Sequence, residues 1–106
     1  MICEVIYKTR LKRRIFCVPV EDIQNWNYFN TFRAIKEELG DRMHEDDYPK
    51  YGMIISLPTN CSPEVEKLLA DIPSIQIDKS MAQTRVKEVF EFCQNTSDLH
   101  NENLTT

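Results

Sequence analysis

The sequence predicts an α/β fold: a small single domain with a mixed four-stranded sheet and three helices, in the order β-β-α-β-α-β-α. Three observations lead to this prediction. A chain of 106 residues is long enough for one domain with a buried core and too short for two. Hydrophobic residues make up 42% and charged residues 28%, which excludes collagen-like, coiled-coil and wholly disordered classes. The apolar spacing alternates at first and becomes helical after residue 22.

Two strands are expected at the start of the chain. Residues 1–9 place Cys3, Val5 and Tyr7 on one side and charged residues on the other, the pattern of a half-buried strand. Residues 14–20 form a nearly continuous apolar run, which is typical of a more central strand. Because only four residues link the two segments, an antiparallel hairpin is predicted.

A helix follows from residue 22 and ends at Leu39. Gly40 stands where a helix end favours a residue with positive φ. A short irregular turn around Trp26 is expected before the regular part, and the candidate N-caps are Asn25, Asn27 and Asn30. The apolar stripe of the helix consists of Tyr28, Phe29, Phe32, Ile35 and Leu39.

The second half of the chain alternates strands and helices. Residues 40–51 are polar and aperiodic, which indicates an exposed loop. Residues 52–57 and 74–78 are predicted strands. Because the last three strands alternate with helices, parallel pairing through right-handed crossovers is favoured, with the order of the strands left open.

The remaining two helices have clear start signals. Ser62 and Pro63 have the residue types of an N-cap and a first helical residue, and Pro73 ends that segment. Ser80 and Gln83 have the spacing of a capping box, which predicts the start of the last helix.

We expect residues 1–94 to form the domain and residues 95–106, which are polar, to be a disordered tail. The longest apolar run, Ile15 to Val20, is too short to span a membrane, and the first residues do not resemble a secretory signal. A soluble, cytoplasmic protein is therefore predicted. Its scattered cysteines are expected to be free thiols: Cys3, Cys17, Cys61 and Cys93.

Charge is unevenly distributed along the chain. The net charge is 13 − 17 = −4. Residues 1–20 hold five cations and one acid, 5 − 1 = +4, and the rest of the chain holds 8 − 16 = −8. The five cations lie at or beside the predicted hairpin turn: Lys8, Arg10, Lys12, Arg13 and Arg14.

Three explanations of this basic hairpin stay open. The charges can simply keep a sheet edge soluble. They can contact an acidic protein, including a second copy of the chain. They can also bind the phosphates of single-stranded RNA, with Tyr7 and Phe16 stacking on bases.

Aromatic residues give a second candidate surface. Phe29 and Phe32 have the helical spacing of core residues. Trp26 lies off this stripe among asparagines, and exposed Trp and Tyr are common anchors of protein interfaces. Packing and interface roles are about equally supported for Trp26 and Tyr28.

No catalytic or metal site is predicted. Cys61 precedes a helix start, where a thiolate is favoured, but no CxxC accompanies it and Lys67 stands where a phosphatase-like loop needs Arg. The segment His44-Glu45-Asp46-Asp47 lacks the spacing of a calcium loop and is expected to be solvated. With only two glycines, the chain has no phosphate-binding loop.

The predicted function is that of a small, non-enzymatic regulatory or adaptor protein that acts through protein–protein contacts, with a partner protein or by self-association as a homodimer. The alternative is binding of single-stranded RNA through the basic hairpin. No cofactor, metal or membrane contact is predicted. The predicted contact residues are Lys8, Arg10, Lys12, Arg13, Arg14, Trp26 and Tyr28.

Overall fold

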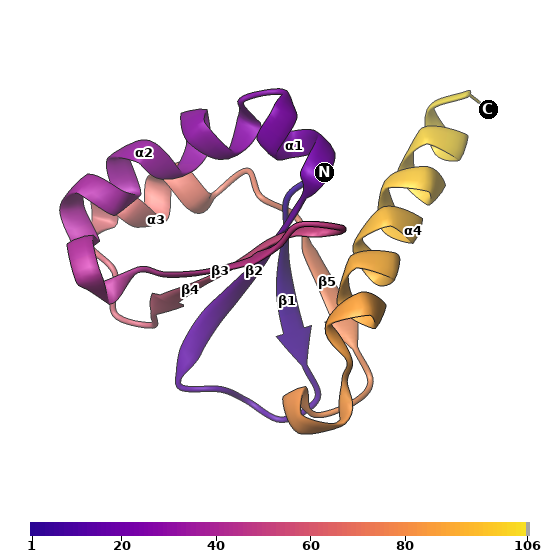
Figure 1. The fold of residues 1–106 in the computed structure, drawn as a ribbon, viewed down its shortest axis with the longest axis horizontal. Coiled ribbons are helices and arrows are strands. Elements are labelled where there is room, and N and C mark those ends of the chain that lie inside the picture. Colours follow the sequence, from indigo (N-terminus) through magenta and orange to yellow (C-terminus); the bar gives the residue numbers. More distant parts are fainter. Residues whose placement is uncertain (106) are drawn as a thin grey trace.

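The structure is a computed structural model that describes residues 1–105, with side chains over residues 1–95. Figure 1 shows a twisted sheet with helices on both faces. The elements in chain order are β1 (Cys3–Tyr7), β2 (Arg13–Pro19), α1 (Val20–Gln24), α2 (Asn27–Leu39), the 3-10 turn η1 (Gly40–Arg42), β3 (His44–Tyr48), β4 (Gly52–Pro58), α3 (Pro63–Leu69), β5 (Ser74–Ile77), the 3-10 turn η2 (Met81–Gln83) and α4 (Val86–Thr105).

The predicted α/β class with a mixed sheet is confirmed, but the sheet has five strands, in the order β3-β4-β2-β1-β5. The structure also has four α-helices rather than three over the described residues, since α1 and α2 are separate. The N-terminal hairpin is antiparallel as predicted, with Cys3 opposite Cys17. β5 is parallel to β1, and every other pair of neighbours is antiparallel.

The expected parallel pairing of the last three strands is wrong for β2 and β4, which are antiparallel. The cause is β3, which forms within the segment predicted to be a loop. The chain crosses the sheet once more in β3 before it enters β4, so β4 runs opposite to β2. β3 has the sequence HEDDY and lies at the sheet edge, where a strand needs no apolar run.

Two hydrophobic cores lie on opposite faces of the sheet. α1, α2 and α3 cover one face, and α4 covers the other (Figure 1). The first core includes Phe16, Val18, Phe32, Ile35, Ile55, Leu57 and Val65. The second includes Cys3, Val5, Ile15, Cys17, Ile75, Val89, Phe90 and Cys93. Cys3, Cys17 and Cys93 are therefore buried in the apolar core, as expected for small hydrophobic side chains.

The predicted helix ends are confirmed in part. Ser62 caps α3 by accepting a hydrogen bond from the Val65 amide at 3.3 Å. Gly40 ends α2 with a φ of 54°, a conformation that suits glycine. The Ser80–Gln83 capping box is present, but it caps the short turn η2, and α4 begins only at Val86.

The last helix runs over the segment expected to be a polar tail. Its backbone is helical up to Thr105. The side chains of residues 96–106 lie outside the described part of the chain, and the disordered tail stays a prediction. Within the described residues, none of the helices combines the length and apolarity needed to cross a membrane.

Candidate protein-interaction surfaces

Arg13 and Arg14 point to opposite faces of the sheet, because neighbouring side chains alternate along β2. Arg13 donates to Ser56 Oγ at 2.5 Å, to the Ser56 carbonyl at 2.9 Å and to the Arg42 carbonyl at 2.6 Å. These bonds tie β2 to β4 and to the turn η1. The guanidinium of Arg13 is therefore used inside the molecule.

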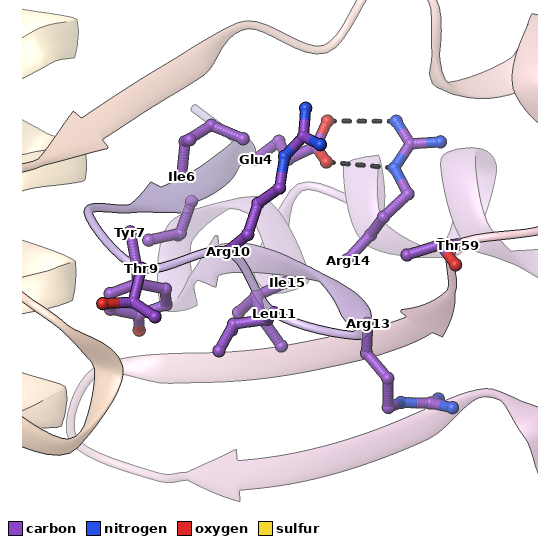
Figure 2. A pocket seen from close by; sticks show the side chains of 11 residues that line it. Glu4, Ile6, Tyr7, Thr9, Arg10, Leu11, Arg13, Arg14, Ile15 and Thr59 are labelled. Carbon is purple, nitrogen blue, oxygen red and sulfur yellow. Dashed lines mark hydrogen bonds and ion pairs between the residues drawn. The ribbon is translucent and has the colours of Figure 1, made fainter.

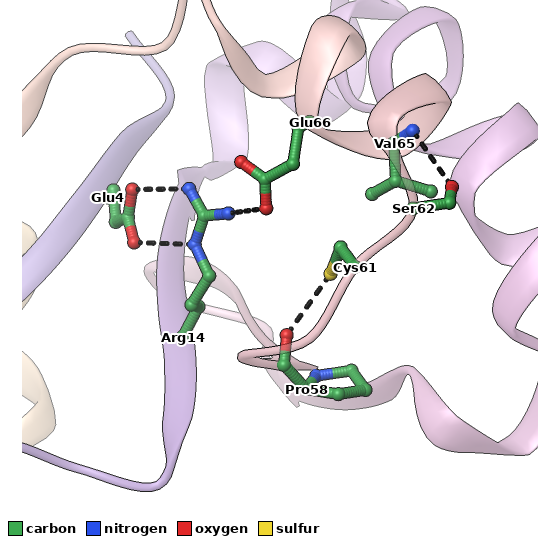
Figure 3. Close-up of polar contacts among 7 residues, drawn as sticks. All are labelled: Glu4, Arg14, Pro58, Cys61, Ser62, Val65 and Glu66. Atoms are coloured by element: carbon green, nitrogen blue, oxygen red, sulfur yellow. Dashed lines mark hydrogen bonds and ion pairs between the residues drawn. The ribbon is translucent and has the colours of Figure 1, made fainter.

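Arg14 is also held by internal contacts, shown in Figure 3. Its guanidinium donates two hydrogen bonds of 3.0 Å to the carboxylate of Glu4 and one of 2.5 Å to Glu66. The side chains of Arg14 and Glu4 are only 22% and 15% exposed. The hydrogen bonds that Arg14 donates to Glu4, and then to Glu66, outweigh burial and raise the pKa of Arg14. Through these hydrogen bonds Arg14 links β2 to β1 and to α3.

The other three cations form a separate basic turn between β1 and β2, which we define as Lys8, Arg10 and Lys12. All three are exposed, and none makes a side-chain hydrogen bond or ion pair to the residues that the structure describes. Arg10 borders a hollow of about 230 Å³ on the sheet face, with Ile6 and Thr59 at its wall (Figure 2). Arg10 and Arg14 extend toward the same side of the hairpin in this view, and Arg13 points away.

Trp26 is exposed through an unusual backbone conformation. It is the N-cap residue of α2, with φ 66° and ψ 6°, in the left-handed region that non-glycine residues rarely adopt. Its side chain is 66% exposed. Strained backbone of this kind costs about 1–2 kcal/mol and is often found at functional positions.

The junction that holds Trp26 is tied down by a buried carboxylate. Asp22, at 5% exposure, accepts a hydrogen bond from the Asn27 side-chain amide at 2.9 Å. Its other oxygen lies 2.9 Å from the amino group of Met1 and is neutralised by that ion pair. The junction between α1 and α2 is thereby fixed to the start of β1.

Trp26 continues into an aromatic ridge on α2, which we define as Trp26, Phe29 and Arg33. The rings of Trp26 and Phe29 meet edge to face with their centroids 5.7 Å apart. The Arg33 guanidinium lies over the Phe29 ring, 5.2 Å from its centroid. Phe29 is 42% exposed, so its assignment to the core stripe is wrong, whereas that of Phe32 is confirmed.

A groove of about 500 Å³ runs along α2 beside the aromatic ridge. Tyr28 borders it and is half-buried, with its hydroxyl donating to the Glu45 carboxylate of β3. Burial, together with this bond, raises the pKa of Tyr28. Tyr28 therefore contributes one side of its ring to the groove, and its hydroxyl holds α2 against β3. The lining residues are Tyr28, Phe29, Phe32, Arg33, Lys36 and Glu37.

The basic turn and the aromatic ridge lie at opposite ends of β2. The turn precedes Arg13, and α1 with Trp26 follows Pro19 (Figure 1). A strand of seven residues spans about 20 Å, so the two surfaces are well separated. The predicted contact residues thus lie on two separate surfaces, and Arg13 and Arg14 differ from the others in making internal hydrogen bonds.

Sequence reasoning missed Phe29 and Arg33 as surface residues. The signal was present, because positions 26, 29 and 33 are separated by three and four residues and share one helix face. This second stripe lies next to the core stripe, and the spacing of Phe29 fits both. The two stripes could be told apart only by knowing which neighbour covers α2.

Cys61 shows no sign of activation. Its thiol donates to the Pro58 carbonyl at 3.1 Å (Figure 3). Burial raises the pKa of Cys61, with a smaller contribution from Glu66, so the reactive thiolate is disfavoured at neutral pH.

The acidic segment from His44 to Asp47 forms the edge strand β3 rather than a loop. Glu45 accepts from Lys36 Nζ at 2.8 Å and from Tyr28, and Asp46 and Asp47 are exposed. Among the described residues, no three His, Cys, Asp or Glu side chains are grouped so that they could hold a metal ion.

Comparisons with protein-family models, with curated proteins and with solved structures found no match for this chain.

Proposed function

We propose that this chain is a non-enzymatic protein-binding module whose main contact surface is the aromatic ridge with its groove on α2. One observation carries the proposal: Trp26 keeps two thirds of its side chain in solvent while its backbone adopts a strained conformation. Tryptophan and arginine are the residues most enriched among those that dominate binding energy at protein interfaces. The ridge presents both.

The partner that fits this surface is a protein segment with one or two large apolar side chains and a nearby carboxylate. The groove offers aromatic walls from Tyr28 and Phe29 to the apolar side chains. Arg33 offers a charge, since its ion pair with Glu37 is exposed and long, at 3.7 Å. A partner carboxylate can replace Glu37 at little cost.

An adaptor role is supported by the distance between the two surfaces. Because the basic turn lies at the other end of β2, a second molecule can bind there while the aromatic ridge is occupied. A regulatory protein with a single contact surface would not need that separation.

The ridge is tested best with Trp26→Gly. Glycine adopts positive φ without strain and is tolerated at an N-cap, so we expect stability within about 1 kcal/mol of the unchanged protein. Loss of an interface anchor should weaken the affinity for the partner by about 30-fold or more. The measurement is affinity capture from native lysate, followed by calorimetric titration of the captured protein with the unchanged chain and with Trp26→Gly, since this variant has no tryptophan to report binding.

Leu68→Ala on α3 is the matched control, because Leu68 has the same 42% exposure as Phe29. We expect this variant to bind like the unchanged protein and Phe29→Ala to bind more weakly. Capture that is equally strong for Trp26→Gly, Phe29→Ala and Leu68→Ala would contradict the proposal.

The alternative, binding of single-stranded RNA, stays a prediction with fewer candidate contacts. Phe16 is fully buried and is not accessible to a base. Arg13 and Arg14 are held by internal bonds, which leaves three cations for phosphates. We expect no gel shift with single-stranded RNA at low salt. A shift that Arg10→Glu abolishes would restore this alternative.

A further inference from the structure

The outer edge of β3 is unpaired and acidic. Among the residues that the structure describes, β3 is the terminal strand of the sheet and pairs with β4 alone. Asp46 and Asp47 are exposed on it and make no side-chain hydrogen bond or ion pair to any described residue. Acidic residues on an edge strand normally prevent pairing with another neutral edge, but they leave the edge open to a basic segment.

The basic turn has the complementary charge. Lys8, Arg10 and Lys12 place three cations within five residues, and their side chains have no counter-charge bound in the described structure. When this turn lies beside an acidic edge strand, opposite charges come close together, and each exposed pair of this kind contributes at most about 1 kcal/mol.

The two surfaces cannot neutralise each other within one molecule. The distance between Asp46 and the basic turn follows from the strand register. Asp46 on β3 is paired with Ile54 on β4, and Ile54 is paired with Cys17 on β2. Cys17 lies four residues along β2 from Arg13. That separation is about 13 Å along the strand and about 10 Å across two strand spacings, and the basic turn lies beyond Arg13. Salt at about 0.1 M screens charges over about 10 Å, so both surfaces keep an uncompensated charge.

We propose that the basic turn of one copy docks against the outer edge of β3 in a second copy. The contact joins two different surfaces, so it is a head-to-tail contact and builds short rings or open chains of copies. It goes beyond the proposed function and does not depend on it, because it uses neither Trp26 nor the groove on α2. The association is electrostatic and is weakened by salt.

The test is sedimentation velocity of the intact chain at low and high salt, about 20 mM and about 500 mM NaCl. We expect concentration-dependent association at low salt that falls at least tenfold in strength at high salt. A chain that is monomeric at low salt at about 100 µM, a concentration at which contacts of micromolar affinity are occupied, overturns the proposal.

Two charge-reversed variants identify the surfaces. One carries Lys8→Glu, Arg10→Glu and Lys12→Glu, and the other carries Asp46→Lys and Asp47→Lys. Each variant alone should be monomeric, because its turn and its edge then repel each other. Mixing the two should restore association, because each intact surface then meets its complement.

The control for net charge is Lys67→Glu with Arg85→Glu and Lys87→Glu, three exposed cations on α3 and at the start of α4. We expect this variant to associate like the unchanged protein. Equal association by the turn-reversed variant and by the control would overturn the proposal, and so would a mixture of the two reversed variants that stays monomeric. Trp26→Gly should associate normally, which separates this outcome from failure of the proposed function.

Discussion

Five cations lie within seven residues of the N-terminal hairpin, and they fall into two groups. Two of them make hydrogen bonds inside the molecule, and the other three are exposed to solvent. Arg13 and Arg14 lie in β2, where each makes three hydrogen bonds to other elements. Lys8, Arg10 and Lys12 lie in the turn and make none with their side chains in the described structure. A strand fixes the direction of each side chain, and neighbouring strands supply partners, whereas a turn does neither.

The same division holds on the acidic strand β3. Glu45 points to the face that carries α2 and is bound by Lys36 and Tyr28. Asp46 points to the other face, away from α2, and stays in solvent. The comparison teaches that net charge counts all ionised groups, while recognition uses mainly those that the fold leaves without an internal partner or with only a weak, exposed one.

The strongest test of this division is Arg14→Ala. Removing the guanidinium leaves the carboxylate of Glu4, which is 15% exposed, without its counter-charge. We expect the free energy of unfolding to fall by about 2–3 kcal/mol, since an unpaired and mostly buried charge is costly. Urea denaturation at pH 7 measures this. A change below about 0.5 kcal/mol, the range of ordinary surface substitutions, would place Arg14 with the turn residues instead.

A smaller effect is expected at Glu45. Burial alone would raise the pKa of Glu45, but the bonds from Lys36 and Tyr28 outweigh it and lower that pKa below 4.5. The stabilisation is therefore complete above pH 4.5 and is lost as pH falls through the lowered pKa. Glu45→Gln should cost about 1 kcal/mol at pH 7, the worth of one hydrogen bond to a charged group in a partly exposed site.

The pH dependence separates this effect from simple loss of packing. We expect the difference in unfolding free energy between Glu45→Gln and the unchanged protein to shrink as pH is lowered from 7 through the lowered pKa of Glu45, because protonation removes the charge that Lys36 and Tyr28 bind. Urea denaturation over that range measures it. A difference that stays constant with pH would contradict the assignment.

The smallest effect is expected for Arg10→Ala. This side chain is exposed and has no internal partner in the described structure, so the free energy of unfolding should stay within about 0.5 kcal/mol of the unchanged protein. Arg10→Ala is also the natural control for Arg14→Ala, because both remove one arginine from the same hairpin. A loss of unfolding free energy above 1 kcal/mol would show that Arg10 stabilises the fold, and the turn cations would then not differ from Arg13 and Arg14.

The sequence was informative where a residue's role depends on its neighbours in the chain. The antiparallel hairpin, the cap at Ser62 and the positive φ of Gly40 all follow from local chemistry, and all are confirmed. The α/β class follows from apolar periodicity and is confirmed as well. These features are set within a few residues, before any distant segment is in place.

What could not be predicted depends on segments that are far apart in the sequence. The residues of β3 are mostly poor strand formers. β3 is a strand because it pairs with β4. The hydrogen bond of Arg14 to Glu66, a residue 52 positions later, could not be predicted from the sequence around Arg14. Phe29 is exposed because α3 and the sheet cover the stripe of α2 that carries Phe32, and not the stripe that carries Phe29.

The position of β1 in the sheet sets the order in which the chain can fold during translation. β1 pairs with β2 on one side, and on the other with β5, where Glu4 meets Ser74, 70 residues later. The core under α1, α2 and α3 is complete with residues 2–69, whereas the core under α4 needs residues up to Cys93. At about 5–20 residues per second, synthesis leaves the second apolar face and the open edge of β1 uncovered for a few seconds. A nascent chain at that stage exposes apolar surface and an unpaired strand edge, the two features that make partly folded chains prone to aggregation.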